Sequence, residues 1–401
     1  MPVDAIIAGT LGLLVIAILV AVAARRLALP YTVGLVVAGM GLALARYDIG
    51  IRLTHDIIFD VILPPLLFEA AINISWPELR RDLVPVLLLS VLGVVISAGV
   101  VSGGMAWLLG WNLAPALMFG VLIAATDPVA VIAMFKDTGI GGRLRMLVES
   151  ESLFNDGVAA VLFGLALAWT QGMAFGPVDA TASLVTVAGG GIAIGLLAGA
   201  AALLVAGRAS EHMIEAAVTG LAAYGAFLGA EYLHVSGVLA TVSAGLLMGS
   251  VGVRGDARFG LSRAGRVFVL ELWDFAAFLA NSLVFLLIGL TVAQVPFARL
   301  GFLPLVVAIL LVLVGRAATI YPLCWVFARS RWAVSAREQH VLWWGGLRGA
   351  LALALVLTLP PDMPGRDAVV IATFGVVAFS VLVQGLSMKW LLRRLSLLPS
   401  K

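Results

Sequence analysis

The stretch that decides the fold reads LAPALMFGVLIAATDPVAVIAM and covers residues 113–134. It is long enough to cross the hydrocarbon core of a bilayer, which takes about 20 apolar residues. Its only acid, Asp127, is followed by Pro128, which has no N–H to donate to the carbonyl of Ala124 and which disfavours helical geometry at Asp127. The helix should therefore break in the middle of the segment, beside a carboxylate and the hydroxyl of Thr126.

Unwound backbone persists at that depth only where protein or a water-filled cavity surrounds it. An ionisable side chain is also costly there without a partner or water, so such residues mark ion pathways. The alternative is a simple proline kink, with Asp127 facing a neighbouring helix. We interpret the break as part of an ion-binding site, because an acid is a poor choice for packing alone.

The whole chain is apolar. Of its 401 residues 62% are hydrophobic and only 12% are charged, against roughly 25% charged residues in a soluble domain. A soluble fold, a disordered chain and a collagen-like chain are excluded by this composition. The single cysteine, Cys324, excludes a disulfide framework and a thiolate metal site. We expect one transmembrane unit over residues 1–401, with no soluble domain, no cleaved signal and no cofactor.

We predict an all-α polytopic membrane protein with about thirteen transmembrane helices. The hydrophobic segments are 5–24, 30–45, 54–73, 84–109, 113–134, 146–170, 181–207, 213–232, 236–251, 264–294, 302–328, 336–358 and 367–392. Nineteen of the twenty-five basic residues lie in alternate connections, four lie in the opposite ones, and Arg316 and Arg348 lie inside segments. Basic residues concentrate on the cytoplasmic side, which predicts an outside N-terminus and a cytoplasmic C-terminus. This distribution also argues against nucleic acid as the reason for the net charge of +3.

A second polar cluster lies in segment 146–170. Ser152 and Asp156 are four residues apart and share a helix face, as do Glu151 and Asn155. A capping cluster at a helix start is the alternative, but it fits residues this far into the segment poorly. In contrast, Asp60, Glu215, Glu231 and Asp274 lie near predicted segment ends, and we interpret them as interfacial side chains.

The remaining intramembrane charges are Glu69, Arg316 and Arg348. Glu69 follows a double proline at 64–65, and a site role and a position near the helix end are equally consistent with that. Glycines surround Arg348 in the segment 336–358. An unpaired guanidinium is implausible in hydrocarbon, so each arginine should pair with an acid or a helix C-terminus.

The two interrupted segments, 113–134 and 336–358, are the fifth and the twelfth of the thirteen, so they lie seven segments apart. If residues 1–170 and 213–395 are repeats joined by a linking helix at 181–207, the two breaks occupy equivalent positions. An odd offset places the halves in opposite orientations. Interrupted helices at corresponding positions of two halves indicate an inverted-repeat transporter.

Four motifs together resemble the monovalent cation:proton antiporter-1 family, most closely its prokaryotic NhaP-type sodium/proton antiporters. They are Thr126-Asp127-Pro128, Phe154-Asn155-Asp156-Gly157, Phe68-Glu69 after the double proline, and Gly345-Gly346-Leu347-Arg348-Gly349. The resemblance covers essentially the whole chain. It implies a six-helix core domain that moves against a dimerisation domain, a homodimer, and a location in the prokaryotic plasma membrane among its lipids.

The resemblance also implies roles for individual residues. Cation and proton would bind at Asp156 and Asp127, with further oxygens from Ser152, Thr126 and Glu69. Asn155 would structure the site, and Glu151 would pair with Arg348. With Asn155 where electrogenic relatives carry a second acid, exchange would be electroneutral, one proton for one cation. The motifs do not separate Na⁺ from Li⁺ or K⁺.

Physical reasoning leads to the same activity. Na⁺ prefers carboxylate, hydroxyl and carbonyl oxygens, and burial favours the protonated form of an acid, so cation and proton can compete for one site. A proton-coupled carrier of another solute is the main alternative, and a K⁺/H⁺ antiporter is another. A channel would need a filter that the sequence lacks. An intramembrane hydrolase lacks a nucleophile elbow, since the four histidines lie near segment ends.

Overall fold

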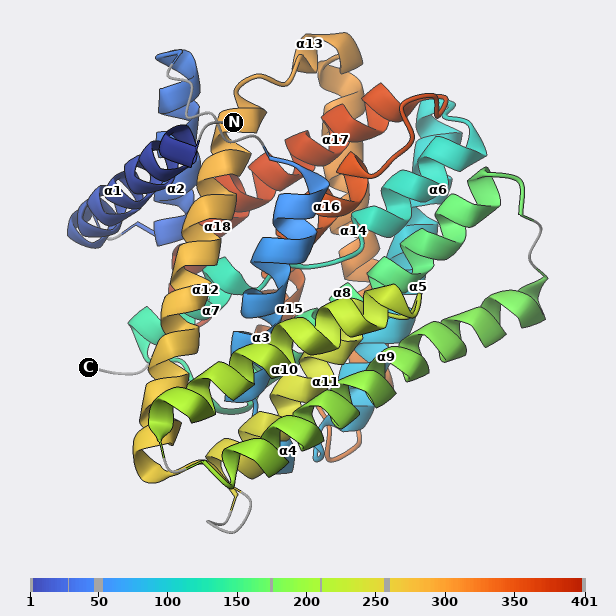
Figure 1. Ribbon diagram of the computed structural model, residues 1–401. Coiled ribbons are helices and arrows are strands. Elements are labelled where there is room, and N and C mark those ends of the chain that lie inside the picture. Colours follow the sequence, from blue (N-terminus) through green and yellow to red (C-terminus); the bar gives the residue numbers. More distant parts are fainter. Residues whose placement is uncertain are drawn as a thin grey trace.

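The computed structural model describes residues 3–27, 29–46, 53–173, 176–209, 211–255 and 260–398. All regular structure in these ranges is helical, and the helices form one bundle (Figure 1). The prediction of an all-α protein is therefore confirmed. Among the described residues, seven helices are long and apolar enough to cross a membrane, so the number of thirteen spans stays a prediction.

Each predicted hydrophobic segment coincides with a helix or with consecutive helical pieces. The uninterrupted helices are α1 (Val3–Leu27), α2 (Tyr31–Leu44), α5 (Leu83–Leu109), α8 (Gly142–Thr170), α9 (Pro177–Ala206), α10 (His212–Tyr232), α12 (Arg263–Val292) and α14 (Phe302–Val326). Three others contain a π-helical turn: η1 (Ile57–Ile62) runs into α3 (Leu63–Asn73), α11 (Gly237–Leu247) runs into η2 (Met248–Val253), and α17 (Arg366–Phe379) continues through η3 (Ser380–Gln384) into α18 (Gly385–Arg394). Two short helices, α4 (Trp76–Leu79) and α13 (Phe297–Leu300), lie in connections.

Two segments are interrupted in the middle, as predicted. The first consists of α6 (Leu113–Leu122) and α7 (Val129–Thr138), and the second of α15 (Ala336–Trp344) and α16 (Ala350–Leu357). The two breaks meet, because the backbone N–H of Asp127 donates to the carbonyl of Leu347 at 2.7 Å. Polar backbone that each break exposes is thus partly satisfied by the other break.

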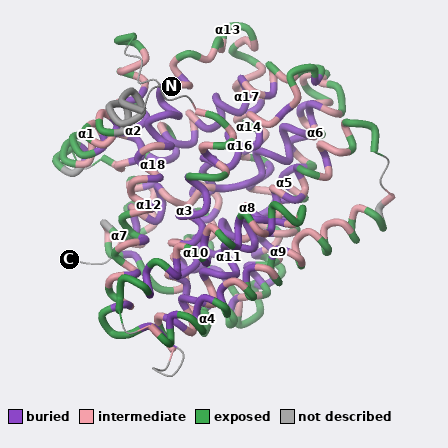
Figure 2. Tube along the Cα trace, in the orientation of Figure 1, coloured by how far each residue is buried: buried purple, intermediate pink, exposed green. Residues whose placement is uncertain are grey.

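Two hydrophobic clusters organise the bundle. The larger one includes buried side chains from α5, α6, α8, α14, α16 and α17, and the smaller one joins α3, α9, α10, α11 and α12. Buried residues concentrate in the middle of the bundle, while α9 and the part of α1 whose burial is described are mostly intermediate or exposed (Figure 2). This grouping is compatible with a division into two domains, and that division stays a prediction.

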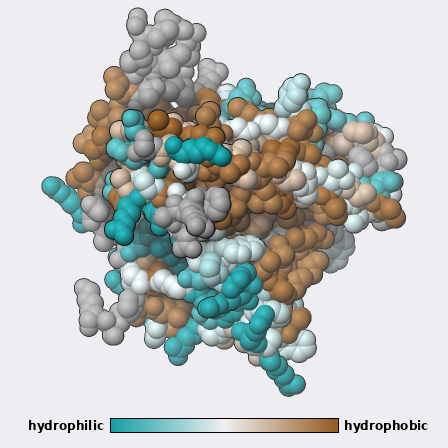
Figure 3. All heavy atoms as spheres, turned by 60° about the horizontal axis from the view of Figure 1, so that its bottom comes forward, coloured by the Kyte–Doolittle hydropathy of each residue, from teal (hydrophilic) through white to brown (hydrophobic). Residues whose placement is uncertain are grey.

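Close helix approach is visible where α2 crosses α12. A Cβ atom added at Gly39 would lie 2.2 Å from the Leu286 carbonyl oxygen, and one at Gly289 would lie 2.1 Å from that of Val36. Small residues allow such backbone contact between membrane helices. The outer surface carries large apolar side chains, and Figure 3 shows broad hydrophobic areas on one face of the molecule. Such a surface suits contact with lipid.

Candidate ion site at the crossing of the broken helices

The five residues predicted to bind cation and proton line one cavity. Its volume is about 290 Å³, and its lining includes Asp127, Asp156, Ser152, Thr126 and Glu69. These residues come from three places in the chain: the break between α6 and α7, the middle of α8, and α3. The second break contributes as well, because residues 349–352 lie in the same lining.

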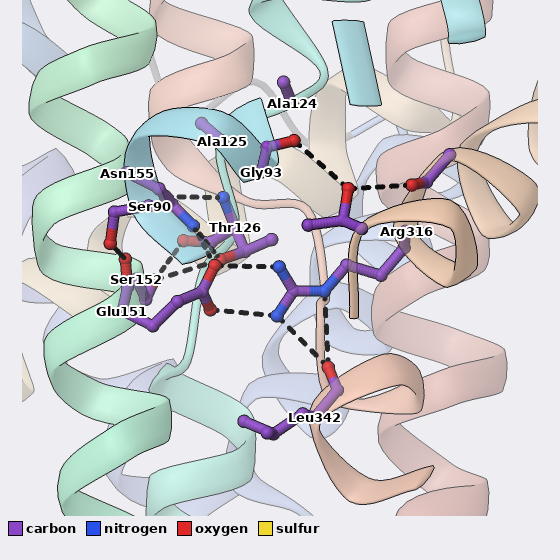
Figure 4. Close-up of polar contacts among 12 residues, drawn as sticks. Ser90, Gly93, Ala124, Ala125, Thr126, Glu151, Ser152, Asn155, Arg316 and Leu342 are labelled. Carbon is purple, nitrogen blue, oxygen red and sulfur yellow. Dashed lines mark hydrogen bonds and ion pairs between the residues drawn. The ribbon is translucent and has the colours of Figure 1, made fainter. Parts of the chain in front are cut away.

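The break at Thr126 is held by the side chains of α8. The Thr126 N–H donates to Asn155 Oδ1 at 3.1 Å, and Asn155 Nδ2 donates to Thr126 Oγ1 at 2.6 Å and to Glu151 Oε1 at 3.0 Å. Ser152 Oγ donates to the Thr126 carbonyl oxygen. Figure 4 shows these contacts together. Asn155 therefore holds both the backbone N–H and the side-chain hydroxyl of Thr126, which gives it a structural function.

The two aspartates have different surroundings. Asp127 Oδ1 accepts the N–H of Val129 at 2.9 Å, so this carboxylate also caps the start of α7. Its other oxygen faces the second break, where a Cβ atom on Gly349 would lie 1.8 Å from Asp127 Oδ2. Only glycine permits this approach. The Asp156 side chain makes no hydrogen bond or ion pair within the described ranges, and it lies in the cavity lining.

The pairing predicted for Glu151 is wrong. Glu151 does not pair with Arg348 but with Arg316, whose Nη1 and Nη2 donate to Glu151 Oε1 and Oε2 at 2.8 and 2.9 Å. Both side chains are buried, with 7% and 3% of their surface exposed. Arg316 also donates to the carbonyl of Leu342, near the end of α15 (Figure 4). The Leu342 carbonyl thus accepts from Arg316 N–H groups that do not bind Glu151.

Arg348 caps a helix instead. Its Nη1 donates to the carbonyl oxygens of Ala124 and Ala125 at 2.7 and 2.9 Å. These carbonyls follow the end of α6, where unpaired acceptors and the negative end of the helix dipole meet. The expectation that each arginine finds an acid or a helix C-terminus is thus confirmed, with one arginine for each. Arg316 and Arg348 were both possible partners of Glu151, and nothing in the sequence distinguished between them.

The lining also contains residues that sequence reasoning missed. They are Lys136 on α7, Glu149 on α8, and Asp274 and Asn281 on α12. Asp274, interpreted above as an interfacial side chain, lies inside α12 and lines the cavity. The sequence could have indicated this position, because Asp274 lies eleven residues after the start of an apolar helix. Glu69 is positioned by Asn73, whose Nδ2 donates to Glu69 Oε1 at 2.8 Å.

Comparison with known proteins identifies the family. The family profile described as "Sodium/hydrogen exchanger, transmembrane" matches residues 12–394. The chain belongs to the sodium/hydrogen exchanger family. It is 41% identical over 375 residues to the Na(+)/H(+) antiporter ApNhaP of Aphanothece halophytica, covering 93% of this chain and 71% of that protein. It is also 34% identical over 401 residues to the Na(+)/H(+) antiporter NhaH of Halobacillus dabanensis, covering 96% and 97%.

The fold of this family member also matches a solved structure. The sodium proton antiporter MjNhaP1 from Methanocaldococcus jannaschii superposes with a TM-score of 0.76 at 21% identity, and the match covers 98% of both chains. The resemblance inferred from four motifs is therefore confirmed at the level of family and fold.

Proposed function

We propose that this protein exchanges Na⁺ for H⁺ across a membrane and is a secondary transporter rather than an enzyme. The observation that carries the proposal is a cavity at the crossing of two broken helices, whose lining brings together Asp127, Asp156, Glu69, Ser152 and Thr126. Carboxylate and hydroxyl oxygens are the ligands that a hard cation such as Na⁺ prefers. Relatives named as Na⁺/H⁺ antiporters support the same conclusion.

Asp156 is the residue at which cation and proton exchange. It lines the cavity without a hydrogen bond or ion pair in the described part of the chain, whereas Asp127 already accepts the Val129 N–H. Asp127, Ser152, Thr126 and Glu69 contribute further oxygens from the same lining. Cation and proton then neutralise one site in turn, and a site with neither carries a charge that is costly to move through the protein.

One proton replaces one cation in each turnover. Asn155 and Glu151 carry no proton through this cycle, because Asn155 is an amide committed to Thr126 and Glu151 is paired with Arg316. Exchange is therefore electroneutral, and only the gradients of H⁺ and Na⁺ drive it. No resident cofactor is required.

The remaining architecture follows the family pattern in this proposal. The two halves of the chain are inverted repeats, and a core containing the crossing moves against a dimerisation domain that is shared between two copies. The protein lies in the lipid of a prokaryotic plasma membrane, with the N-terminus outside and the C-terminus in the cytoplasm. The two hydrophobic clusters support the division into two parts.

The test is transport by purified protein in liposomes loaded with a pH-sensitive dye. Na⁺ added outside should move protons, and Asp156→Asn, which is isosteric, should remove this movement while the protein still elutes as a folded species. K⁺ and another solute are tested as alternative substrates, and a response to them without a response to Na⁺ would replace the proposal. For the stoichiometry, the membrane potential is clamped at zero or inside-negative with K⁺ and valinomycin. An equilibrium Na⁺ ratio that shifts with the potential would refute electroneutral exchange.

A further inference from the structure

A lysine lies in the lining of the same cavity as the ion-binding aspartates. Lys136 is in the last turn of α7, and its Nζ lies 3.7 Å from Asp274 Oδ1 on α12. Both residues line the cavity. They are also the more exposed part of it, because 49% of the Lys136 side chain and 59% of the Asp274 side chain are accessible. We call this end of the cavity, defined by Lys136, Asp274, Glu69 and Glu149, the mouth.

Three acids and one ammonium lie at the mouth, and the ammonium contacts Asp274. Glu69 and Glu149 line the same cavity as this pair, so the charge of Lys136 acts on both carboxyl groups as well. The other basic group in contact is Arg145, whose Nε lies 3.6 Å from Glu149 Oε2. These residues come from α3, α7, α8 and α12. A cation that enters from this side therefore meets carboxylates that are already partly neutralised.

The contact between Lys136 and Asp274 is easily broken. At 3.7 Å it is an ion pair without a hydrogen bond, and both side chains are about half exposed to solvent. Exposed pairs of this kind contribute little to stability and are screened by salt. This distinguishes it from the buried, bidentate pair of Glu151 and Arg316. A pair with such a small free energy suits a group that must be displaced repeatedly.

We propose that Lys136 is a built-in competitor of the transported cation. Its ammonium neutralises the acids at the mouth, and a Na⁺ ion arriving from this side must displace it before reaching Asp156. Lys136 thereby sets the apparent affinity for the cation on this face of the membrane. It acts through Asp274, Glu69 and Glu149 and does not bind the ion itself. The inference rests on the proposed Na⁺/H⁺ exchange.

A purely structural function for Lys136 predicts something different. A lysine in the last turn of a helix interacts favourably with the helix dipole, so its loss would lower the stability of α7. That loss would reduce the amount of folded protein and the maximal rate, but it would leave the KM for Na⁺ unchanged. The KM is therefore the measurement that separates the two.

The experiment measures the apparent KM for Na⁺ separately on each face of oriented proteoliposomes, at an alkaline pH where protons compete little. Lys136→Gln should lower the KM on one face by roughly two- to five-fold, the range expected for losing one partly exposed charge. Lys136→Arg keeps the charge and should retain the wild-type KM. Asp274→Asn removes an acid and releases the lysine toward Glu69, so the KM should rise.

Ionic strength gives a second readout that does not depend on comparing folded amounts. Raising the ionic strength from about 0.05 to 0.5 M with choline chloride should bring the KM values of the wild-type protein and of Lys136→Gln closer together, because exposed charges are screened. An unchanged KM in Lys136→Gln, or an equal change in Lys136→Arg, would overturn the proposal. If the wild-type protein shows no Na⁺-dependent proton movement, the proposed function fails instead, so the two failures are distinguishable.

Discussion

Replacing Glu151 by glutamine should destabilise the protein by about 3–5 kcal/mol, the usual cost of removing one partner from a buried ion pair. The size follows from burial: only 7% of the Arg316 side chain and 3% of the Glu151 side chain are exposed, and two hydrogen bonds of 2.8 and 2.9 Å join them. Without the carboxylate, the guanidinium stays in a low-dielectric environment with the Leu342 carbonyl. An exposed pair would cost no more than about 1 kcal/mol.

The identity of the partner is tested by double-mutant cycles. Arg316→Gln combined with Glu151→Gln removes both charges, so the double mutant should be less destabilised than the sum of the single mutants by about 2 kcal/mol or more. Arg348→Gln combined with Glu151→Gln should give nearly the sum, because Arg348 donates to the Ala124 and Ala125 carbonyls. Unfolding in mixed detergent micelles, followed by tryptophan fluorescence, gives the free energies.

A matched control comes from the mouth of the cavity. Asp274→Asn breaks an ion pair whose side chains are 49% and 59% exposed, so its free energy of unfolding should change by less than about 1 kcal/mol. The reasoning is refuted if Glu151→Gln costs no more than this control. It is also refuted if Glu151 couples to Arg348 and not to Arg316.

Three further outcomes are expected at the site. Asp127→Asn should abolish Na⁺/H⁺ exchange in liposomes yet leave the protein folded, since an amide oxygen can still accept the Val129 N–H; exchange at the wild-type rate would remove Asp127 from the site. Gly349→Ala should reduce transport by at least about ten-fold, because its Cβ would displace the Asp127 carboxylate by overlap at 1.8 Å. Gly103→Ala, where a Cβ meets nothing within 4 Å, is the control and should transport normally. On acidification the apparent KM for Na⁺ should rise by up to about ten-fold per pH unit, as expected when one proton competes with one cation, and the rate at saturating Na⁺ should persist; a fall in that rate without a change in KM would argue against competition.

The fold was accessible from the sequence because its strongest signals are local. Apolar length marks each segment, and a proline or a group of glycines inside a segment marks each break. Asp127 and Gly349 lie at those breaks, so their position near the cavity could be inferred from the sequence alone. The convergence of Asp127, Asp156 and Glu69 on one cavity also followed, although it needed the family resemblance in addition to the spacing.

The partners of the buried charges were not accessible in the same way. Arg316 and Arg348 are both single cations in apolar segments, and either could meet Glu151 by its position along a helix. Which arginine pairs with Glu151 depends on how the second break crosses the first. The crossing places Arg348 against the end of α6, so Glu151 pairs with Arg316 on α14. The ion pair of Lys136 and Asp274 depends in the same way on how α7 is placed beside α12.

The crossing has a consequence for biosynthesis. The hydrogen bonds from Arg348 to Ala124 and Ala125 join residues that are 224 and 223 positions apart. A ribosome must therefore make most of the chain before these carbonyls receive their guanidinium. Until then the first break has to find other donors, such as water or the insertion machinery, while it waits in the membrane. The crossing consequently forms only late in synthesis, and a chain truncated before the second break would insert many of its helices yet leave Ala124 and Ala125 uncapped.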